Sequence, residues 1–384
     1  MTDATTQNES VFWRMVSALW FSAASARAWT YRSGLRRQQR LRAPVISIGN
    51  LSFGGTGKTP FTIWLAGKLG EHGYRAAVLT RGYRRASKGV RIHPPGSSWL
   101  SAGDGPNLAH SPAHDGDEVQ LYLRHLPQAA VGIAPHRYNA GQLIEAQLPV
   151  DVHLLDDGFQ HLPLARALDI VLIDASNPWG APSWGPNAGL TRALREPPLA
   201  LRRADCLLLT RCDQIAPTTL TALEAELRDI YAGHAAAAIH HAETRLTGFR
   251  VRLDESAVPA SSLAGKRVAA FCGVGNPDSF FAMLRASGIA PVATRVFPDH
   301  HHYNDQDVDQ LNELLRNHRA EALITTEKDV VNLPNAAQFA GNFIAPAYWA
   351  EINMAIREED ELLRIILEKI GPPAPRSAPD SERY

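Results

Sequence analysis

Cysteine is scarce in this sequence of 384 residues, which holds only 3, at Cys206, Cys212 and Cys272. No two of them stand at a short spacing, so a zinc cage and a disulfide framework are not expected, and the pattern fits a reducing compartment. An excess of charge of one sign is also missing, because the formal net charge at pH 7 is +0. This balance argues against a nucleic-acid partner, and no segment indicates an obligate protein partner.

A long apolar run is missing as well. The apolar stretch between Arg14 and Arg27 is shorter than the roughly 20 residues that a membrane-spanning helix needs, and no small-residue cleavage site of a secretory signal follows it. The hydrophobic share of 45% is nevertheless that of a globular protein with a substantial core. The chain length leaves room for about two domains.

Acidic residues are absent between Ser10 and Arg42, a segment rich in arginine and aromatic residues. Its apolar residues recur at helical spacing on one face, at Phe12, Met15, Leu19 and Ala23. A basic amphipathic helix with aromatic residues is typical of a segment that lies in a membrane interface. The alternative is a helix that packs on its own domain with its arginines in solvent. We expect residues 11–42 to contact a membrane surface.

The most informative stretch runs from Pro44 to Pro60. The apolar residues Val45 to Ile48 predict a buried strand, and the residues from Phe61 to Leu69 predict a helix. A glycine-rich turn that ends in Gly-Lys-Thr connects them, which is the order of a phosphate-binding P-loop. Lys58 is then expected to reach the terminal phosphates of a nucleotide, and the Thr59 hydroxyl is expected to bind Mg²⁺.

One position departs from the general P-loop pattern. Ser52 stands where the pattern has its first glycine, although Gly49, Gly54 and Gly55 lie close by. A plain glycine-rich turn before a helix is the alternative interpretation. The position of Gly-Lys-Thr between a strand and a helix favours the P-loop.

Two groups of acidic residues follow predicted elements. An apolar strand ends in Asp156 and Asp157, which is the form of a Walker B element whose carboxylate holds Mg²⁺ directly or through water. Asp117 and Glu118 instead stand at the start of a predicted helix, after a long predicted loop at 86–116. Acidic residues at such a position are often N-caps, and spacing alone favours that interpretation for this pair.

The C-terminal part predicts a second α/β unit. Two extended segments are predicted at 236–256, a strand-turn-helix sequence restarts at Arg267, and further strands are predicted at 292–297 and 322–326. Three consecutive histidines begin at His300, and neighbours on an extended chain point in alternating directions. A single functional histidine beside Asp299 is therefore favoured over a metal site.

These elements predict an α/β fold, in which a P-loop-containing parallel sheet domain is joined by a β linker to a second, smaller α/β subdomain. An amphipathic, membrane-associated helix precedes them. The expected segments are the N-terminal helix at 1–42, the P-loop domain at 43–235, the linker at 236–262, the smaller subdomain at 263–370 and a flexible tail at 371–384.

Taken together, the motifs resemble those of the tetraacyldisaccharide 4'-kinase (lipid A 4'-kinase) family over about residues 11–370. The stretches that carry the resemblance are Gly49–Pro60, Arg81–Tyr83, Gly116–Glu118, Asp156–His161, Leu194–Pro197, Phe271–Pro277, Phe297–His300 and Thr326–Asp329. Ser52 fits the loop of this family. The joint order of these stretches is far more specific than any one of them.

The resemblance implies a P-loop kinase that transfers the γ-phosphate of ATP to the 4'-hydroxyl of a tetraacylated disaccharide-1-phosphate, a lipid A precursor, in lipopolysaccharide biosynthesis. It implies ATP and Mg²⁺ as cofactors and an active site in the cleft between two subdomains. It also implies an enzyme at the cytoplasmic face of the inner membrane, peripheral or monotopic.

Residue roles follow from the family pattern, position by position. The residues implied to bind the nucleotide are Ser52, Phe53, Gly54, Gly55, Thr56, Gly57, Lys58 and Thr59. Thr59 and Asp156 are implied to serve Mg²⁺. Asp117 is implied to be the general base that takes the proton of the 4'-hydroxyl, and His300 is implied to pair with it and to raise its basicity. Lys58 completes the catalytic set.

The acceptor side carries three implied residues and one departure from the pattern. Glu118, Asp157 and Glu196 are implied to orient the acceptor sugar or the network beside it. The segment 179–196 lacks the Gly-Asn-Gly and Leu-Pro-Ala-Gly-Pro runs of the family. The phosphate site is unaffected by this change, whereas the exact disaccharide and its acyl pattern stay open.

Two rival interpretations come from other classes. The first is a P-loop GTPase or metal-chaperone-like NTPase switch, because Thr210 to Asp213 faintly matches a guanine-specificity element. No switch Asp-x-x-Gly follows the Walker B strand, which argues against it. The second is a membrane-bound interaction protein with a decayed nucleotide site, against which the intact Gly-Lys-Thr and acidic motifs speak.

Overall fold

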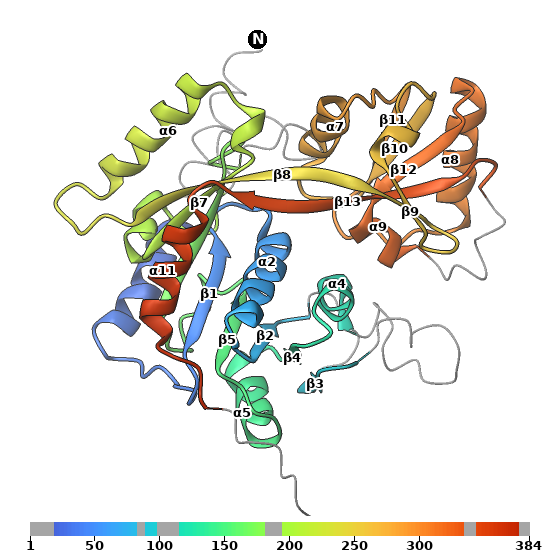
Figure 1. Cartoon of the computed structure of the whole chain (residues 1–384). Helices are drawn as coiled ribbons and strands as arrows, with labels where there is room; N and C mark the ends of the chain where they lie inside the picture. Colours follow the sequence, from blue (N-terminus) through green and yellow to red (C-terminus); the bar gives the residue numbers. More distant parts are fainter. Residues whose placement is uncertain (1–18, 83–88, 98–114, 181–193, 334–342, 376–384) are drawn as a thin grey trace, which may run out of the picture.

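The computed structural model describes residues 19–82, 89–97, 115–180, 194–333 and 343–375. The predictions for residues 11–18, Tyr83, the segment 181–193 and the tail from 376 fall outside these ranges. Figure 1 shows two α/β halves joined by two long strands, and the strands form one 13-stranded sheet. The α/β class is confirmed, with a mixed sheet in place of a purely parallel one.

The P-loop half contains the central part of the sheet. Its strands, in spatial order, are β7 (Cys206–Thr210), β6 (Leu168–Asp174), β1 (Val45–Asn50), β5 (Val152–Asp156), β2 (Ala76–Thr80), β4 (Ala130–Ile133) and β3 (Arg91–His93). All of these pairs are parallel except the antiparallel pair of β3 with β4. Parallel strands that are buried on both faces have continuous apolar sequences. The sequence analysis predicted the parallel strands of this half on that basis, and it did not predict β3.

Helices cover both faces of this half. Helices α2 (Lys58–Glu71) and α4 (Asp117–His125) pack on one face, and α5 (Arg137–Gln147) and α6 (Pro217–Ile230) pack on the other. Short 3-10 turns, η3 (Pro198–Arg203) and η4 (Cys212–Gln214), flank β7. The predicted long loop at 86–116 was partly wrong, because β3 lies within it. A strand of three residues is too short to show a periodic pattern.

Strands β8 (Ala238–Val251) and β13 (Ala347–Ile356) join the two halves. The first residues of β8 pair in parallel with β7, and its remainder pairs antiparallel with β13. The prediction of two extended segments at 236–256 was therefore wrong, since one strand of 14 residues changes partner without a break. The short strand β9 (Ala257–Val258) folds back onto its end, followed by the turn η5 (Ala260–Ser262).

The second half repeats the layered plan on a smaller scale. Strands β11 (Ala293–Val296), β10 (Val268–Cys272) and β12 (Ala322–Thr326) extend the sheet beyond β13. Helix α7 (Pro277–Ala286) packs on one face, and α8 (Asp305–His318) packs on the other. The short helix α9 (Glu327–Asn332) follows β12 directly and faces the P-loop half in Figure 1.

Helix α11 (Glu359–Ile370) was expected to belong to the smaller subdomain at 263–370, but it packs on the P-loop half. Its apolar residues Leu362, Leu363 and Ile366 belong to the core that α2 covers in the P-loop half. The Lys68 ammonium of α2 lies 2.8 Å from the Glu359 carboxylate. The chain thus returns to the P-loop half after β13, because α11 buries its apolar face there.

A helix at residues 19–32 precedes the sheet, in agreement with the helical pattern of the sequence. It carries exposed large apolar side chains, and its Trp20 indole donates a hydrogen bond of 2.8 Å to the Arg195 carbonyl. Within the described ranges, no helix combines the length and the apolar character needed to span a bilayer.

Candidate active site

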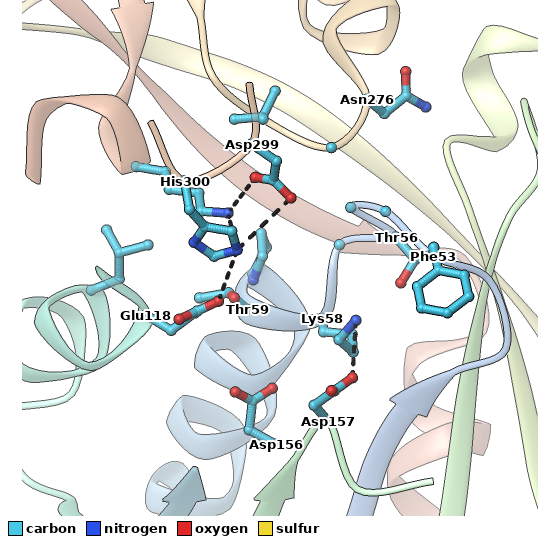
Figure 2. A pocket seen from close by; sticks show the side chains of 18 of the residues that line it. Phe53, Thr56, Lys58, Thr59, Glu118, Asp156, Asp157, Asn276, Asp299 and His300 are labelled. Carbon is cyan, nitrogen blue, oxygen red and sulfur yellow. Dashed lines mark hydrogen bonds and ion pairs between the residues drawn. The ribbon is translucent and has the colours of Figure 1, made fainter. Parts of the chain in front are cut away.

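A cavity of about 1150 Å³ opens at the carboxyl ends of the central strands. The P-loop, the end of β5, the start of α4 and the turn after β10 all contribute to its wall. Figure 2 shows the labelled side chains of both halves around this space. The carboxyl edge of an open α/β sheet is where such folds bind their ligands, so the predicted site lies at the expected edge.

The P-loop adopts the turn that its glycines allow. Gly54 and Gly57 have φ values of 112° and 86°, a backbone region that side-chain-bearing residues rarely adopt. The Asn50 amide holds the Ser52 carbonyl at 2.8 Å from beneath the loop. All residues from Gly54 to Thr59 line the cavity.

The first two predicted loop residues have other surroundings. Ser52 is buried and forms a β-bridge with Leu194. Phe53 is 55% exposed, and the Arg195 guanidinium lies 5.5 Å from the centre of its ring. Phe53 is at the cavity wall, whereas Ser52 supports the loop from below.

The two carboxylates predicted to form the Walker B element, Asp156 and Asp157, lie beside the P-loop in the cavity wall. Asp157 accepts hydrogen bonds of 2.7 Å from Arg195, and the Lys58 ammonium lies 3.3 Å from it. Burial opposes its charge, but Lys58 and Arg195 outweigh burial and hold the pKa of Asp157 well below its usual range. Lys58 is thus held beside the cavity by its ion pair with Asp157.

Asp156 and Thr59 fit a magnesium ion. Asp156 is buried, and burial followed by the charge of Asp157 raises the pKa of its carboxyl. The Thr80 hydroxyl donates a long hydrogen bond of 3.3 Å to it. A buried carboxylate in this state gains from a nearby cation, and oxygen ligands are the ones that Mg²⁺ prefers. Both side chains line the same part of the cavity.

The predicted pair of Asp117 and His300 comes together across the two halves. His300 Nδ1 lies 2.7 Å from Asp117 Oδ2. The Asn332 amide donates to the same oxygen at 3.2 Å, and the Glu118 backbone N–H donates to Oδ1 at 3.0 Å. The Asp117 carboxylate is almost fully buried behind His300, whereas His300 lines the cavity.

The expected effect of His300 on the basicity of Asp117 is wrong. Burial alone would raise the pKa of Asp117, but the hydrogen bond from His300 and the charge of Lys328 outweigh it, so the pKa is well below its usual range. Donors and positive charge stabilise the ionised carboxylate and make it a weaker base. Asp117 is therefore a fixed anion at neutral pH.

Lys328 is a site residue that the sequence analysis did not assign. Its ammonium lies 2.9 Å from Asp299 and 3.3 Å from His300 Nε2. The ligand atoms of Asp117, Glu118 and His300 lie within 4.8 Å of one another, close enough to hold a metal ion. Because the Lys328 ammonium already supplies positive charge there, this group is better described as a hydrogen-bonded acid–base cluster.

The remaining acceptor-side predictions differ in their contacts. Glu118 lines the cavity, and burial together with Asp117 raises the pKa of its carboxyl well above the usual value. Glu196 also reaches the cavity wall, but Arg203 donates to both of its oxygens, at 2.6 and 3.0 Å. Glu118 has His300 Nε2 at 3.8 Å, whereas Glu196 is held by two hydrogen bonds from Arg203.

The segment that suggested a guanine site has another use. The Thr210 hydroxyl donates to the Thr56 carbonyl at 3.1 Å, and Arg211 donates to the Gly55 carbonyl at 2.8 Å. Of residues 210–213, Arg211 is the one found among the described residues of the cavity wall. The segment therefore supports the P-loop, which removes the main argument for a GTPase switch.

An intact P-loop that faces an acid–base cluster across one cavity defines the class of P-loop phosphotransferases. The model of one such family, described as tetraacyldisaccharide-1-P 4'-kinase, matches residues 10–371. The chain belongs to this family, as the motifs of the sequence had predicted.

Individual relatives agree with this membership. A tetraacyldisaccharide 4'-kinase of Anaeromyxobacter dehalogenans (strain 2CP-C) is 39% identical over 350 residues, which cover 89% of this chain and 84% of the relative. One from Geobacter metallireducens is 40% identical over 311 residues, covering 81% and 85%. The crystal structure of an Aquifex aeolicus LpxK, described as an apo form in complex with ATP, matches with a TM-score of 0.66 at 28% identity, covering 93% of this chain and 98% of that one.

Proposed function

We propose that this protein transfers the γ-phosphate of ATP to the 4'-hydroxyl of a tetraacylated disaccharide-1-phosphate, a step of lipid A biosynthesis. The observation that carries the proposal is the shared cavity, in which Lys58 of the P-loop and His300 of the other half line one space. Family membership supplies the acceptor, since the matching family is described as a 4'-kinase of this disaccharide. The ATP complex of the Aquifex aeolicus relative supports the donor.

The P-loop and the Walker B strand carry the nucleotide side. Backbone N–H groups between Gly54 and Thr59 surround the β- and γ-phosphates, and Lys58 leaves Asp157 to neutralise them. Thr59 and Asp156 hold Mg²⁺, which neutralises charge on the phosphates when bound. Asp157 keeps its negative charge through the Arg195 contact, so Lys58 can move without leaving an unpaired carboxylate.

The proton of the acceptor passes to the pair of Asp117 and His300. The 4'-oxygen forms a bond to the γ-phosphorus, the bond from that phosphorus to the bridging oxygen breaks, and ADP leaves. The hydroxyl proton moves to the pair, in which Asp117 stabilises the positive charge that His300 would gain. The Lys328 ammonium lies 3.3 Å from His300 Nε2 and is proposed to stabilise negative charge on the transferred phosphoryl group.

The acceptor lies where the cavity changes from polar to apolar. Glu118 and Asp157 offer oxygens to sugar hydroxyls near the phosphate site. The cavity wall also contains apolar side chains, among them Trp20, Ile63, Trp64, Phe280, Met283 and Ile352. An amphipathic lipid sugar requires this combination of surfaces. Glu196 is proposed to act through the Arg203 pair that fixes the segment beside Arg195.

A nucleotide-preference assay separates this function from the GTPase alternative. We expect ATP hydrolysis and transfer to depend on the lipid acceptor, with little selectivity for guanine. Strong selectivity for guanine nucleotides, together with nucleotide hydrolysis at the same rate with and without the lipid, would instead identify a switch protein.

We further propose that residues 11–42 bind the cytoplasmic face of the inner membrane, peripherally or monotopically. The described part of this segment exposes Leu19, Trp29 and Leu35, which are 71%, 60% and 69% accessible. Arginines flank these side chains, as expected for contact with anionic lipid. The same helix places Trp20 and Arg27 in the cavity wall, so the lipid-facing segment is continuous with the acceptor site.

Charge placed on this apolar face should weaken membrane binding. The double variant Trp29→Glu, Leu35→Glu is expected to reduce co-sedimentation with anionic vesicles about tenfold. Each change removes an apolar side chain that the membrane would bury, and it adds a negative charge that anionic lipids repel. Leu253→Glu is the matched control, since Leu253 is 60% exposed and lies after β8, outside the segment. Equal loss in the control, or unchanged sedimentation of the double variant, would contradict the membrane assignment.

A further inference from the structure

Thr210 and Arg211, at the end of β7, contact the back of the P-loop. The Thr210 hydroxyl donates to the Thr56 carbonyl at 3.1 Å, and the Arg211 guanidinium donates to the preceding carbonyl, that of Gly55, at 2.8 Å. Thr210 is buried and is not part of the described cavity wall. These side chains therefore hold two consecutive carbonyls of the loop away from the phosphate side.

The direction of the carbonyls fixes the direction of the phosphate-binding groups. In a trans peptide, the C=O of one residue and the N–H of the next point in opposite directions. Holding the carbonyls of Gly55 and Thr56 toward β7 turns the N–H groups of Thr56 and Gly57 the other way. Those are groups of the glycine-rich loop that would surround a phosphate.

A third side chain links this contact to the other half of the protein. Asp174, at the end of β6, accepts a hydrogen bond from Arg211 and another, of 2.7 Å, from the Asn276 amide. Asn276 caps α7 through its side-chain oxygen, which accepts from the Ser279 N–H at 3.1 Å. Figure 2 shows Asn276 in the turn above the P-loop.

The backbones of the two halves also touch at this point. A side chain at Gly275 would place its Cβ 2.4 Å from the Gly55 nitrogen, which leaves room for glycine alone. The turn after β10 therefore lies directly against the P-loop, and Asn276 joins it to Asp174 and Arg211. The position of the second half and the direction of the loop carbonyls are connected through these residues.

We propose that Thr210 and Arg211 are positioning residues of the phosphate site, which orient the P-loop N–H groups and link them through Asp174 to Asn276. This inference rests on the proposed nucleotide site and adds contacts that hold the backbone of its loop. Arg211 makes its contact from the cavity wall, whereas Thr210 lies outside the described wall. We therefore predict that ATP affinity depends even on Thr210, a side chain that does not line the cavity.

The test is ATP affinity measured by calorimetry on the full chain, with the KM for the lipid acceptor measured beside it. Arg211→Met is expected to raise the Kd of ATP about 10- to 100-fold, because it removes a charged donor to the Gly55 carbonyl and the ion pair with Asp174. Thr210→Val is expected to raise it about 3- to 10-fold, because it removes a buried hydrogen bond to the loop. The acceptor KM should stay within about twofold. Arg211→Lys should restore part of the affinity, since one ammonium does not reproduce the two-partner contact.

Controls separate positioning from loss of stability. Arg75→Met removes another ion pair, in which Arg75 donates to Asp151 at 2.7 and 2.8 Å far from the cavity. It should lower Tm while leaving the Kd of ATP unchanged. The double variant of Arg211→Met with Asn276→Ala should lose less ATP affinity than the sum of its single losses, because both act through Asp174.

The outcomes distinguish this inference from the proposed function. If the wild type binds ATP, Lys58→Ala loses binding and both Thr210→Val and Arg211→Met retain the wild-type Kd, the positioning role is overturned while the nucleotide site stands. If the wild type does not bind ATP, the positioning role and the proposed function are both overturned. A parallel rise of the ATP Kd in Arg75→Met would also overturn it, because the effect would then follow stability alone.

Discussion

Replacement of Lys58 by alanine is expected to lower phosphate transfer at least about a hundredfold, which is the usual effect of removing one group that stabilises transition-state charge. The Lys58 side chain is 15% exposed and lies 3.3 Å from Asp157. Asp157 retains its Arg195 partner in the variant, so the fold should persist while the phosphates lose their cation. The measurement is transfer of labelled phosphate to the lipid acceptor at saturating acceptor.

Lys68→Ala is the matched control for this change. Lys68 lies in the same helix, α2, and pairs with Glu71 and Glu359 outside the cavity. An exposed ion pair of this kind contributes about 0–1 kcal/mol to stability, so the control should transfer phosphate at the wild-type rate. A Lys58→Ala enzyme as active as this control would remove the P-loop from the mechanism.

Asp117→Asn is expected to lower turnover about 10²- to 10⁴-fold, the typical contribution of a positioned acid–base group. The amide keeps the size of the carboxylate but loses the charge that pairs with His300 at 2.7 Å. ATP affinity should remain near that of the wild type, because Asp117 is buried and is not part of the described cavity wall. His300→Ala should cost at least as much as the change at Asp117, because His300 takes the proton and Asp117 stabilises the charge that His300 gains. Single-turnover kinetics with bound ATP measures both.

A neighbouring pair supplies the control for this prediction. His301 Nε2 lies 2.8 Å from Asp307, which also caps α8. Asp307→Asn keeps an oxygen for the cap and should leave turnover unchanged. Wild-type rates in both Asp117→Asn and His300→Ala would show that the proton is taken elsewhere, with Glu118 as the next group to examine.

Local patterns were sufficient for much of the fold. The strands β1, β5 and β6 are mainly apolar runs that end in asparagine or aspartate, and such runs are visible one segment at a time. The P-loop and the Walker B carboxylates follow directly from these runs, so their meeting at one sheet edge was predictable. Membership of the family added Asp117, whose position at a helix start had favoured an ordinary cap.

Contacts between distant segments were not predictable in the same way. Strand β8 changes partner from β7 to β13 in mid-course, and no local pattern marks the change. Helix α11 returns to the first core only because β13 brings the chain back. Lys328 and Asn332 stand one turn apart in α9, a spacing that hints at a shared face, but their target Asp117 is more than two hundred residues earlier.

The basicity of Asp117 shows a second limit of prediction from sequence. A sequence identifies partners by type, whereas a pKa depends on how many donors and charges converge on one oxygen. Asp117 Oδ2 accepts hydrogen bonds from His300 and Asn332, and the Lys328 ammonium lies 3.8 Å from the same oxygen. Three groups that favour the ionised form outweigh burial, so the sign of the shift becomes visible only in the assembled site.

The account is tested most directly by incubating the wild-type protein with labelled ATP, Mg²⁺ and a tetraacylated disaccharide-1-phosphate in detergent micelles. We predict that the lipid gains one labelled phosphate at the 4'-position, and that an acceptor with a blocked 4'-hydroxyl gains none. Binding of ATP without any labelled lipid, or labelling that persists when the 4'-hydroxyl is blocked, would contradict the proposed reaction.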